Sequence, residues 1–162
     1  MHSHKMLLDE VEEESFRLVA IYCPVEQYRM AYLLNKYLSL HLKRARQDVD
    51  FNHKSVQAMY ALFTSKDHKT HCVYNLVTNK YKGQARKILS SGSLFYEEEV
   101  RPLVVHLIPE YKKVDFFLKI QEEIPSNTYK KLLNVINNIP QVLAAYNIDA
   151  DNLKSKENLI FE

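Results

Sequence analysis

The order of strand-like and helix-like segments constrains the fold of this chain more than any other feature. Seven short segments are rich in aromatic and β-branched residues or alternate between apolar and polar positions, which is typical of β-strands. Two others, residues 25–40 and the segment after Pro125, repeat apolar residues at helical spacing. The strand-like segments are 15–23, 42–51, 56–63, 71–79, 103–108, 114–121 and 142–148.

Several strand-like segments follow one another across short polar connections, which favours antiparallel pairing. The sequence therefore predicts an α+β fold: a mainly antiparallel sheet of six to seven strands with two principal helices packed on it. A length of 162 residues fits a single globular domain, 1–162. Residues 1–14 form an acidic N-terminal segment, and residues 150–162 form a tail whose apolar end, Leu159 to Phe161, is expected to dock.

Individual segments carry more specific expectations. Segment 42–51 is half polar and is expected to be an edge strand, and the polar residues 65–69 are expected to join two strands as a hairpin. The segment 81–100 is the least regular, and we expect a short helix near 84–89 followed by a loop.

Two further expectations concern the second half of the chain. In segment 114–121, alternation predicts that Asp115 and Lys119 lie on the polar face of a strand. The helix after Pro125 is expected to be capped by Ser126 or Asn127 and to end at Pro140. Its predicted apolar stripe consists of Tyr129, Leu132, Leu133, Ile136 and Ile139.

Composition excludes several classes of function. The chain has only 2 glycines, Gly83 and Gly92, and they are isolated. Loops that bind phosphate groups need two or three glycines within a few residues, so the familiar nucleotide and dinucleotide sites are excluded and no cofactor is predicted. The 2 cysteines, Cys23 and Cys72, are too few for a disulfide framework.

The N-terminal segment is acidic where a signal peptide would be apolar. No apolar run approaches the roughly 18 residues of a spanning helix. We therefore expect a cytoplasmic protein that does not enter a membrane.

Histidine is frequent, with 7 residues, but the spacing does not favour a metal site. His68 and His71 flank the predicted hairpin turn without a matching third ligand. His106 lies in an apolar strand, and His2 and His4 lie at the N-terminus. No metal site is predicted.

Residues 108–116 carry the most distinctive motif: Ile108, Pro109 and Glu110, then three residues, then Val114, Asp115 and Phe116. This segment resembles the signature of an uncharacterised bacterial family that is named for its motif I-P-E-x-x-x-V-D-Y. The resemblance extends over most of the chain, and Phe116 departs from the family's tyrosine. It implies no activity, cofactor or catalytic residue.

The motif has two physical interpretations. Pro109 ends the preceding strand, so the motif is expected to form a corner in which Glu110 or Asp115 accepts backbone hydrogen bonds. Alternatively, Glu110 and Asp115 form a carboxylate pair for acid–base chemistry or metal binding, with His106 as a third group.

Charge is strongly segregated along the chain. The net charge is −3 over residues 1–35, +8 over 36–93 and −3 over 94–162, although the whole chain carries only +2. Basic residues interleaved with an aromatic ring are typical of surfaces that bind single-stranded nucleic acid. The candidate anion- or nucleic-acid-binding residues are Lys43, Arg44, Arg46, Lys80, Tyr81, Lys82, Arg86 and Lys87. The alternative is that these cations pair with glutamates of the same chain or of a second copy.

Three functional hypotheses follow. The first is a non-enzymatic module that binds a protein partner or itself, because catalytic and cofactor motifs are missing and the acidic and basic segments are complementary. The second is an RNA-associated protein that uses the basic segment 36–93. The third, a small enzyme built on Glu110 and Asp115, has the least support.

Overall fold

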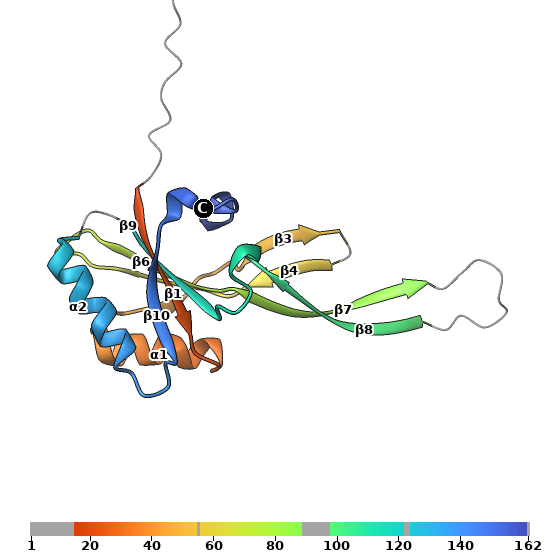
Figure 1. Cartoon of the computed structure of the whole chain (residues 1–162), viewed down its shortest axis with the longest axis horizontal. Helices are drawn as coiled ribbons and strands as arrows, with labels where there is room; N and C mark the ends of the chain where they lie inside the picture. Colours follow the sequence, from red (N-terminus) through yellow and green to blue (C-terminus); the bar gives the residue numbers. More distant parts are fainter. Residues whose placement is uncertain (1–14, 55, 89–97, 122–123, 162) are drawn as a thin grey trace, which may run out of the picture.

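The computed structural model describes residues 15–54, 56–88, 98–121 and 124–161, with side chains left undescribed at 85–88 and 98–99. Its central element is a six-stranded sheet in the order β10-β1-β9-β6-β5-β2, in which every neighbouring pair is antiparallel. The two helices lie beside this sheet, and two further two-stranded hairpins extend from it on the side away from α2 (Figure 1). The α+β fold predicted from the sequence is confirmed.

The elements follow the predicted order closely. The strands of the main sheet are β1 (Phe16–Tyr22), β2 (Lys43–Arg44), β5 (Leu62–Lys66), β6 (Val73–Thr78), β9 (Phe116–Gln121) and β10 (Ala144–Ile148). The helices are α1 (Gln27–Leu38) and α2 (Ser126–Asn137). The hairpins are β3 (Val49–His53) with β4 (Val56–Tyr60), and β7 (Lys80–Ile88) with β8 (Glu98–His106). Single 3-10 turns are η1 (Pro109–Tyr111), η2 (Ala150–Asn152) and η3 (Lys156–Leu159).

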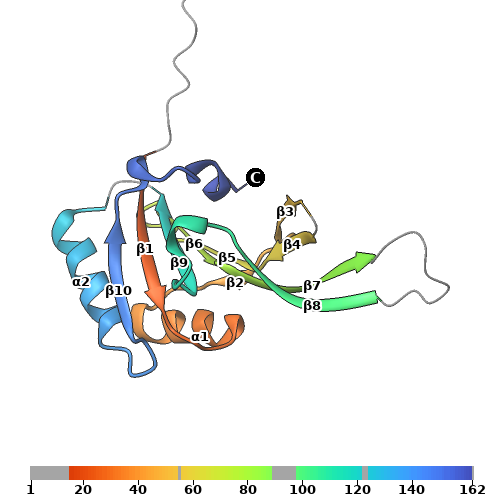
Figure 2. The same cartoon turned by 45° about the vertical axis from the view of Figure 1, so that its right-hand side comes forward.

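The sheet separates two apolar cores. On one face, side chains of β1, β6 and β9 pack against α1 and α2. On the other face, the same strands pack against β4, the 108–116 corner and the C-terminal segment 150–161. Strand β9 serves both cores: Phe116 and Leu118 lie on the helix side, and Phe117 lies on the opposite side. The two views agree that the helices and the C-terminal segment lie on opposite sides of the sheet (Figures 1 and 2).

Two predicted strands are interrupted. Residues 42–51 divide into β2 in the main sheet and β3 in a hairpin, because the chain turns after Arg44 and that turn is closed by an ion pair with Asp48. Residues 56–63 divide into β4 and β5 at Ala61, whose N–H bonds to the Thr78 hydroxyl at 3.0 Å. The predicted hairpin between β5 and β6 is confirmed.

The helix expected near 84–89 is wrong for its described part, since residues 84–88 belong to β7. Pairing with β8 over the whole length of β7 outweighs the helical preference of Gln84, Ala85 and Arg86. Residue 89 and the loop expected after it lie outside the described residues, apart from the start of β8 at Glu98.

Three details of the second half also differ. The N-cap of α2 is Pro125, and neither Ser126 nor Asn127 caps it. Val114 precedes β9 and packs in the core opposite the helices. Lys119 is buried rather than exposed, because the C-terminal segment covers it and the Leu159 carbonyl accepts a hydrogen bond from its ammonium group at 2.8 Å. The apolar tail docks as expected through Leu159 and Phe161, whereas Ile160 is exposed.

Candidate functional site

Asn79, fully buried between β6 and β7, holds the 108–116 corner in place. Its side-chain amide donates to the carbonyl oxygens of Tyr111 and Val114, at 2.8 and 2.9 Å, and accepts from the Ile108 N–H at 2.8 Å. Its backbone also bonds to the backbones of Leu107 and Asp115. Because one amide bonds to three backbone groups of the corner, it restrains the conformation of that corner.

The two acidic residues of the motif have separate partners. Glu110 accepts hydrogen bonds from the backbone N–H and the hydroxyl of Ser155, each at 2.9 Å. Asp115 accepts from the Cys23 backbone N–H and from the Lys80 ammonium group, also at 2.9 Å each. One carboxylate therefore attaches the C-terminal segment, and the other joins the end of β1 to the start of β7.

The remaining motif residues contribute to the cores. Ile108 and Val114 are fully buried on one side of the sheet, and Phe116 is buried on the helix side. Pro109 opens the 3-10 turn η1, which places Glu110 at its second position. These contacts account for the motif as an architectural corner that joins three parts of the chain.

Desolvation is the largest effect on the pKa of Glu110 and raises it. Hydrogen bonds from the Glu110 backbone and from Ser155 and Lys154 together outweigh desolvation, and the pKa lies below its ordinary value. The pKa of His106 is lowered chiefly by desolvation and further by the charges of Lys80 and Lys112. The pKa of Glu110 is therefore lowered, whereas a general acid at neutral pH needs a raised one.

An open cleft of about 580 Å³ lies where the β7–β8 hairpin leaves the main sheet. We call the β7–β8 hairpin the arm, and the cleft at its base the arm-base cleft. Four of the predicted anion-binding residues line it: Arg44, Lys80, Tyr81 and Lys82. Arg44 and the pair Lys80 and Lys82, which are more than thirty residues apart in the sequence, are thus brought to one place.

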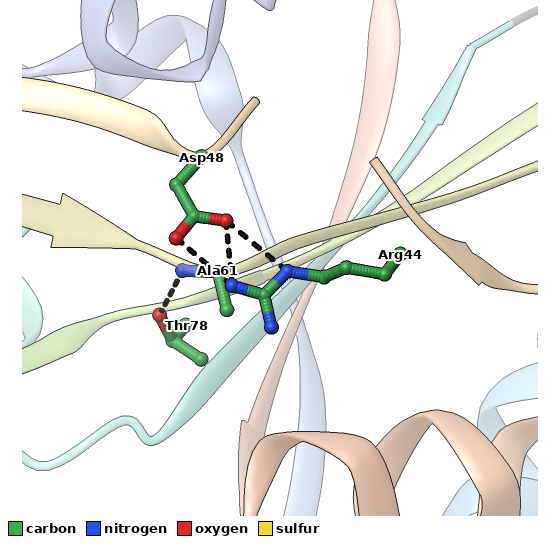
Figure 3. Close-up of polar contacts among 4 residues, drawn as sticks. All are labelled: Arg44, Asp48, Ala61 and Thr78. Carbon is green, nitrogen blue, oxygen red and sulfur yellow. Dashed lines mark hydrogen bonds and ion pairs between the residues drawn. The ribbon is translucent and has the colours of Figure 1, made fainter. Parts of the chain in front are cut away.

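Carboxylates balance the cations of the arm-base cleft. Glu26, Asp48 and Asp115 line it together with the three basic side chains. Arg44 pairs with Asp48 through three hydrogen bonds of 2.6 to 3.1 Å, and Figure 3 shows this pair beside the Ala61–Thr78 bond. Lys80 pairs with Asp115. The cleft therefore has no excess of positive charge among its described lining residues.

The other predicted basic residues lie elsewhere. Lys43 is exposed on β2, and Arg46 lines a different cavity, on the sheet face opposite the helices. Arg86 and Lys87 belong to the outer part of β7, where only the backbone is described.

Tyr81 lines the arm-base cleft together with the lysines, but its side chain leaves β7 in another direction. Strand alternation places it on the opposite face of β7 from Lys80 and Lys82. Its ring packs edge-on against the buried Tyr60, with centroids 6.4 Å apart. The ring of Tyr81 is therefore held by a contact with Tyr60 rather than standing alone between the two lysines.

Within the described residues, no group of three His, Cys, Asp or Glu side chains is placed to hold a metal ion. His68 and His71 are exposed in the β5–β6 turn, and His71 has a positive φ of 58°. His2 and His4 lie outside the described residues. In the part of the chain that the structure covers, no helix is long and apolar enough to span a membrane.

The sequence reasoning missed two features. The β7–β8 hairpin was not recognised, although alternation of Lys80, Lys82, Gln84 and Arg86 is a period-2 signal. The central role of Asn79 was also missed, because nothing in the local sequence distinguishes it from the neighbouring turn-forming residues. No protein-family model matches this chain, and no significantly similar curated protein or solved structure is found.

Proposed function

We propose that this protein is a non-enzymatic, self-associating interaction module, and that the arm is the element that contacts a second copy. The observation that carries this proposal is the exposure of Val100 and Val104, which are 46% exposed each on the arm. A cytoplasmic location belongs to the same proposal, and it is supported by Cys23 and Cys72, which are both buried and do not form a disulfide with each other.

The arm projects from the body. Its two strands pair with each other over nine residue pairs, from Lys80 opposite His106 to Ile88 opposite Glu98. Contacts with β4 and η1 hold its base, and its outer part extends away from the sheet in both views (Figures 1 and 2). A two-stranded hairpin alone is marginally stable in water, so a projecting arm of this length favours completion by another chain.

One face of the arm suits a protein contact. Val100, Pro102 and Val104 alternate along β8 and share this face, with Lys82 and Gln84 opposite them on β7. All five are exposed. An apolar stripe beside long basic side chains is the usual composition of a docking surface with a polar rim.

Pro102 determines how the arm is contacted. In an antiparallel hairpin, hydrogen-bonded and non-hydrogen-bonded residue pairs alternate. The bond from the Leu107 N–H to the Asn79 carbonyl makes the pair 79 and 107 hydrogen-bonded, which fixes the type of every later pair along the hairpin. By that alternation, the position opposite Gln84 is not hydrogen-bonded to β7, so the backbone nitrogen of Pro102 faces the outer edge. Proline has no N–H there, which disfavours addition of a strand to this edge. The face, rather than the edge, is therefore the contact surface.

A second copy is the partner favoured by charge. The basic segment 36–93 with net charge +8 is flanked in the sequence by segments of −3 each, so one chain carries segments of both signs. In the proposed symmetric dimer, segments of opposite charge from the two copies meet twice, and the total charge of +2 per chain does not oppose association.

RNA binding through the basic residues has less support. Two of the three cations in the arm-base cleft pair with Asp48 and Asp115, and the ring of Tyr81 packs against Tyr60. Phosphate groups would have to compete with carboxylates of the same chain, and the half-buried ring of Tyr81 is already in contact with Tyr60.

Sedimentation equilibrium over a range of protein concentrations tests self-association. Wild type is expected to be dimeric, and Val104→Asp to weaken the dimer at least about tenfold, because a carboxylate would be buried in an apolar contact. Leu143→Asp is the matched control: it places the same charge on a side chain that is 76% exposed outside the arm, and it should leave the dimer unchanged.

Circular dichroism should show that both variants remain folded. A wild-type protein that stays monomeric at every concentration would contradict the proposal. If that monomer also raised the anisotropy of a labelled RNA, the RNA hypothesis would replace it. Equal weakening by both substitutions would show that the arm is not the contact.

A further inference from the structure

A row of polar side chains crosses the sheet face that lies opposite the helices. Thr64 on β5 pairs with Asn75 on β6, and Asn75 pairs in turn with Lys119 on β9. Their neighbours on this face, Leu62 and Val77, are buried apolar residues. Polar residues in the middle of an otherwise apolar sheet face are informative, because their desolvation costs free energy that apolar residues would avoid.

Asn75 is the most unusual member of this row. It is 5% exposed, and its side chain makes no hydrogen bond with a described residue. A buried amide of this kind normally has protein partners. Among the described residues, Gln141 Oε1 is the side-chain polar atom that is both fully enclosed and without a partner. The amide atoms of Asn75 also have no partner there, so they cannot be fully enclosed and must retain some contact with solvent.

The cavity above Asn75 has a volume of about 470 Å³, and we call it the polar groove. Thr64, Asn75 and Gln121, from three adjacent strands, form its floor. Arg46 and Gln47, which follow β2, form one wall, and Phe161 of the C-terminal segment forms another. Small-molecule sites in proteins span roughly 300–1,000 Å³.

The charges and hydrogen-bonding groups of the polar groove define a ligand class. Arg46 is the one charged side chain among its described lining residues, in contrast to the balanced arm-base cleft. A guanidinium group pairs with a carboxylate through two parallel hydrogen bonds. The amides and the hydroxyl of the floor both donate and accept, as hydroxyl or amide groups of a ligand require.

We propose that the polar groove binds a small organic acid that carries hydroxyl or amide groups. Arg46 holds the carboxylate at the wall, Asn75 and Thr64 bond to the polar groups of the ligand at the floor, and Phe161 covers its carbon skeleton. This site is separate from the arm and does not depend on self-association.

The test is a titration of the ¹⁵N-labelled full-length protein with malate, followed by NMR of the side-chain amide groups. Malate has two carboxylates and a hydroxyl group and fits the proposed class. The neutral diamide malamide, of the same size, is the matched ligand control. We expect a saturable shift of the Asn75 amide resonances with malate, and binding of malamide at least about tenfold weaker.

Three variants define the site. Arg46→Gln should weaken malate binding at least about tenfold, whereas Arg29→Gln, on the exposed surface of α1, should not change it. Asn75→Leu should abolish binding and raise the Tm of the ligand-free protein by roughly 2–4 °C, because an apolar side chain of similar volume replaces a buried amide that has no hydrogen bond with a described residue.

The rise in Tm distinguishes a binding role from a structural one, since an amide needed for folding would give a lower Tm when replaced. No saturable shift with malate, unchanged affinity in Arg46→Gln, or a lower Tm in Asn75→Leu would each overturn the proposal.

Discussion

The carboxylate of Glu110 accepts two hydrogen bonds from Ser155, one from the backbone N–H and one from the hydroxyl, each at 2.9 Å. These residues are 45 positions apart, and their contact attaches the C-terminal segment to the 108–116 corner. Two further bonds secure the same segment: Asn158 to the Leu107 carbonyl and Lys119 to the Leu159 carbonyl. The motif thus holds the tail that closes the second core.

Replacing Glu110 should loosen the tail without unfolding the domain. In Glu110→Gln, loss of the charge-assisted bonds to Ser155 should cost about 1.5 kcal/mol. Amide hydrogen exchange of residues 153–161 should then be roughly tenfold faster, while exchange in β1 and β9 stays the same. Glu157→Gln, an exposed substitution in η3, is the control and should not change the exchange. Equal acceleration in β1 would contradict a local role.

The same contact should depend on pH. The pKa of Glu110 lies below its ordinary value of 4.5 in the folded protein. Its stabilising contribution is therefore fully present above pH 4.5 and is lost as the pH falls through the lowered folded value. Protection of the tail amides should decrease in that acidic range in wild type and should not change there in Glu110→Gln. A tail whose protection depends equally on pH in both proteins would contradict this assignment.

Asn79 should be among the least replaceable residues. Asn79→Ala removes the side-chain partner of the buried Ile108 N–H and Val114 carbonyl, and it leaves the Tyr111 carbonyl with the Val114 N–H alone. We expect a loss of about 3 kcal/mol or more in the free energy of unfolding, measured with urea. Asn127→Ala, at an exposed position in α2, should change it by less than about 0.5 kcal/mol. A small effect at Asn79 would mean that the corner does not need this amide.

His106 should titrate below its ordinary pKa of 6.5, because desolvation and the charges of Lys80 and Lys112 disfavour its protonated form. Protonation therefore opposes folding, and stability should fall as the pH drops from 6.5 through the lowered value. In Lys80→Met, the pKa of His106 should rise but stay below 6.5, since desolvation is the largest cause. NMR of the histidine ring protons measures both values. An increase above 6.5 in the variant would contradict this order of causes.

The Arg44–Asp48 pair should contribute little to stability. Both residues are partly exposed, with side-chain exposures of 44% and 24%. A double-mutant cycle with Arg44→Ala and Asp48→Ala should give a coupling energy of about 1 kcal/mol or less, which decreases as salt is added. A coupling energy several times larger and independent of salt would show that the pair is more than a surface contact.

Local patterns were enough to predict most of the main sheet and both helices. The continuous apolar run of β1 and the stripe of Tyr129, Leu132 and Ile136 in α2 are signals within one segment, and the structure confirms them. Such signals depend on neighbours a few residues away, which a sequence displays directly.

The errors occur where distant contacts decide the structure. Lys119 is buried only because the tail, forty residues later, covers it and provides the Leu159 carbonyl. The strand expected through Ala61 is interrupted by a hydroxyl from Thr78, which belongs to another strand. Residues 84–88 have helical preferences, but pairing with β8 makes them a strand. The prediction of a basic surface failed to include the carboxylates that neutralise it for the same reason. Asp48 and Asp115 are brought to Arg44 and Lys80 by the fold.

The most direct test of the central claim is an isotope-filtered nuclear Overhauser experiment on a mixture of ¹³C-labelled and unlabelled copies of the protein. It detects methyl groups of one copy that lie against the other copy. If the arm joins two copies, the methyl groups of Val100 and Val104 will show intermolecular contacts. Contacts confined to other methyl groups, such as those of Leu143, or no intermolecular contacts at all, would contradict the proposal that the arm joins two copies of this chain.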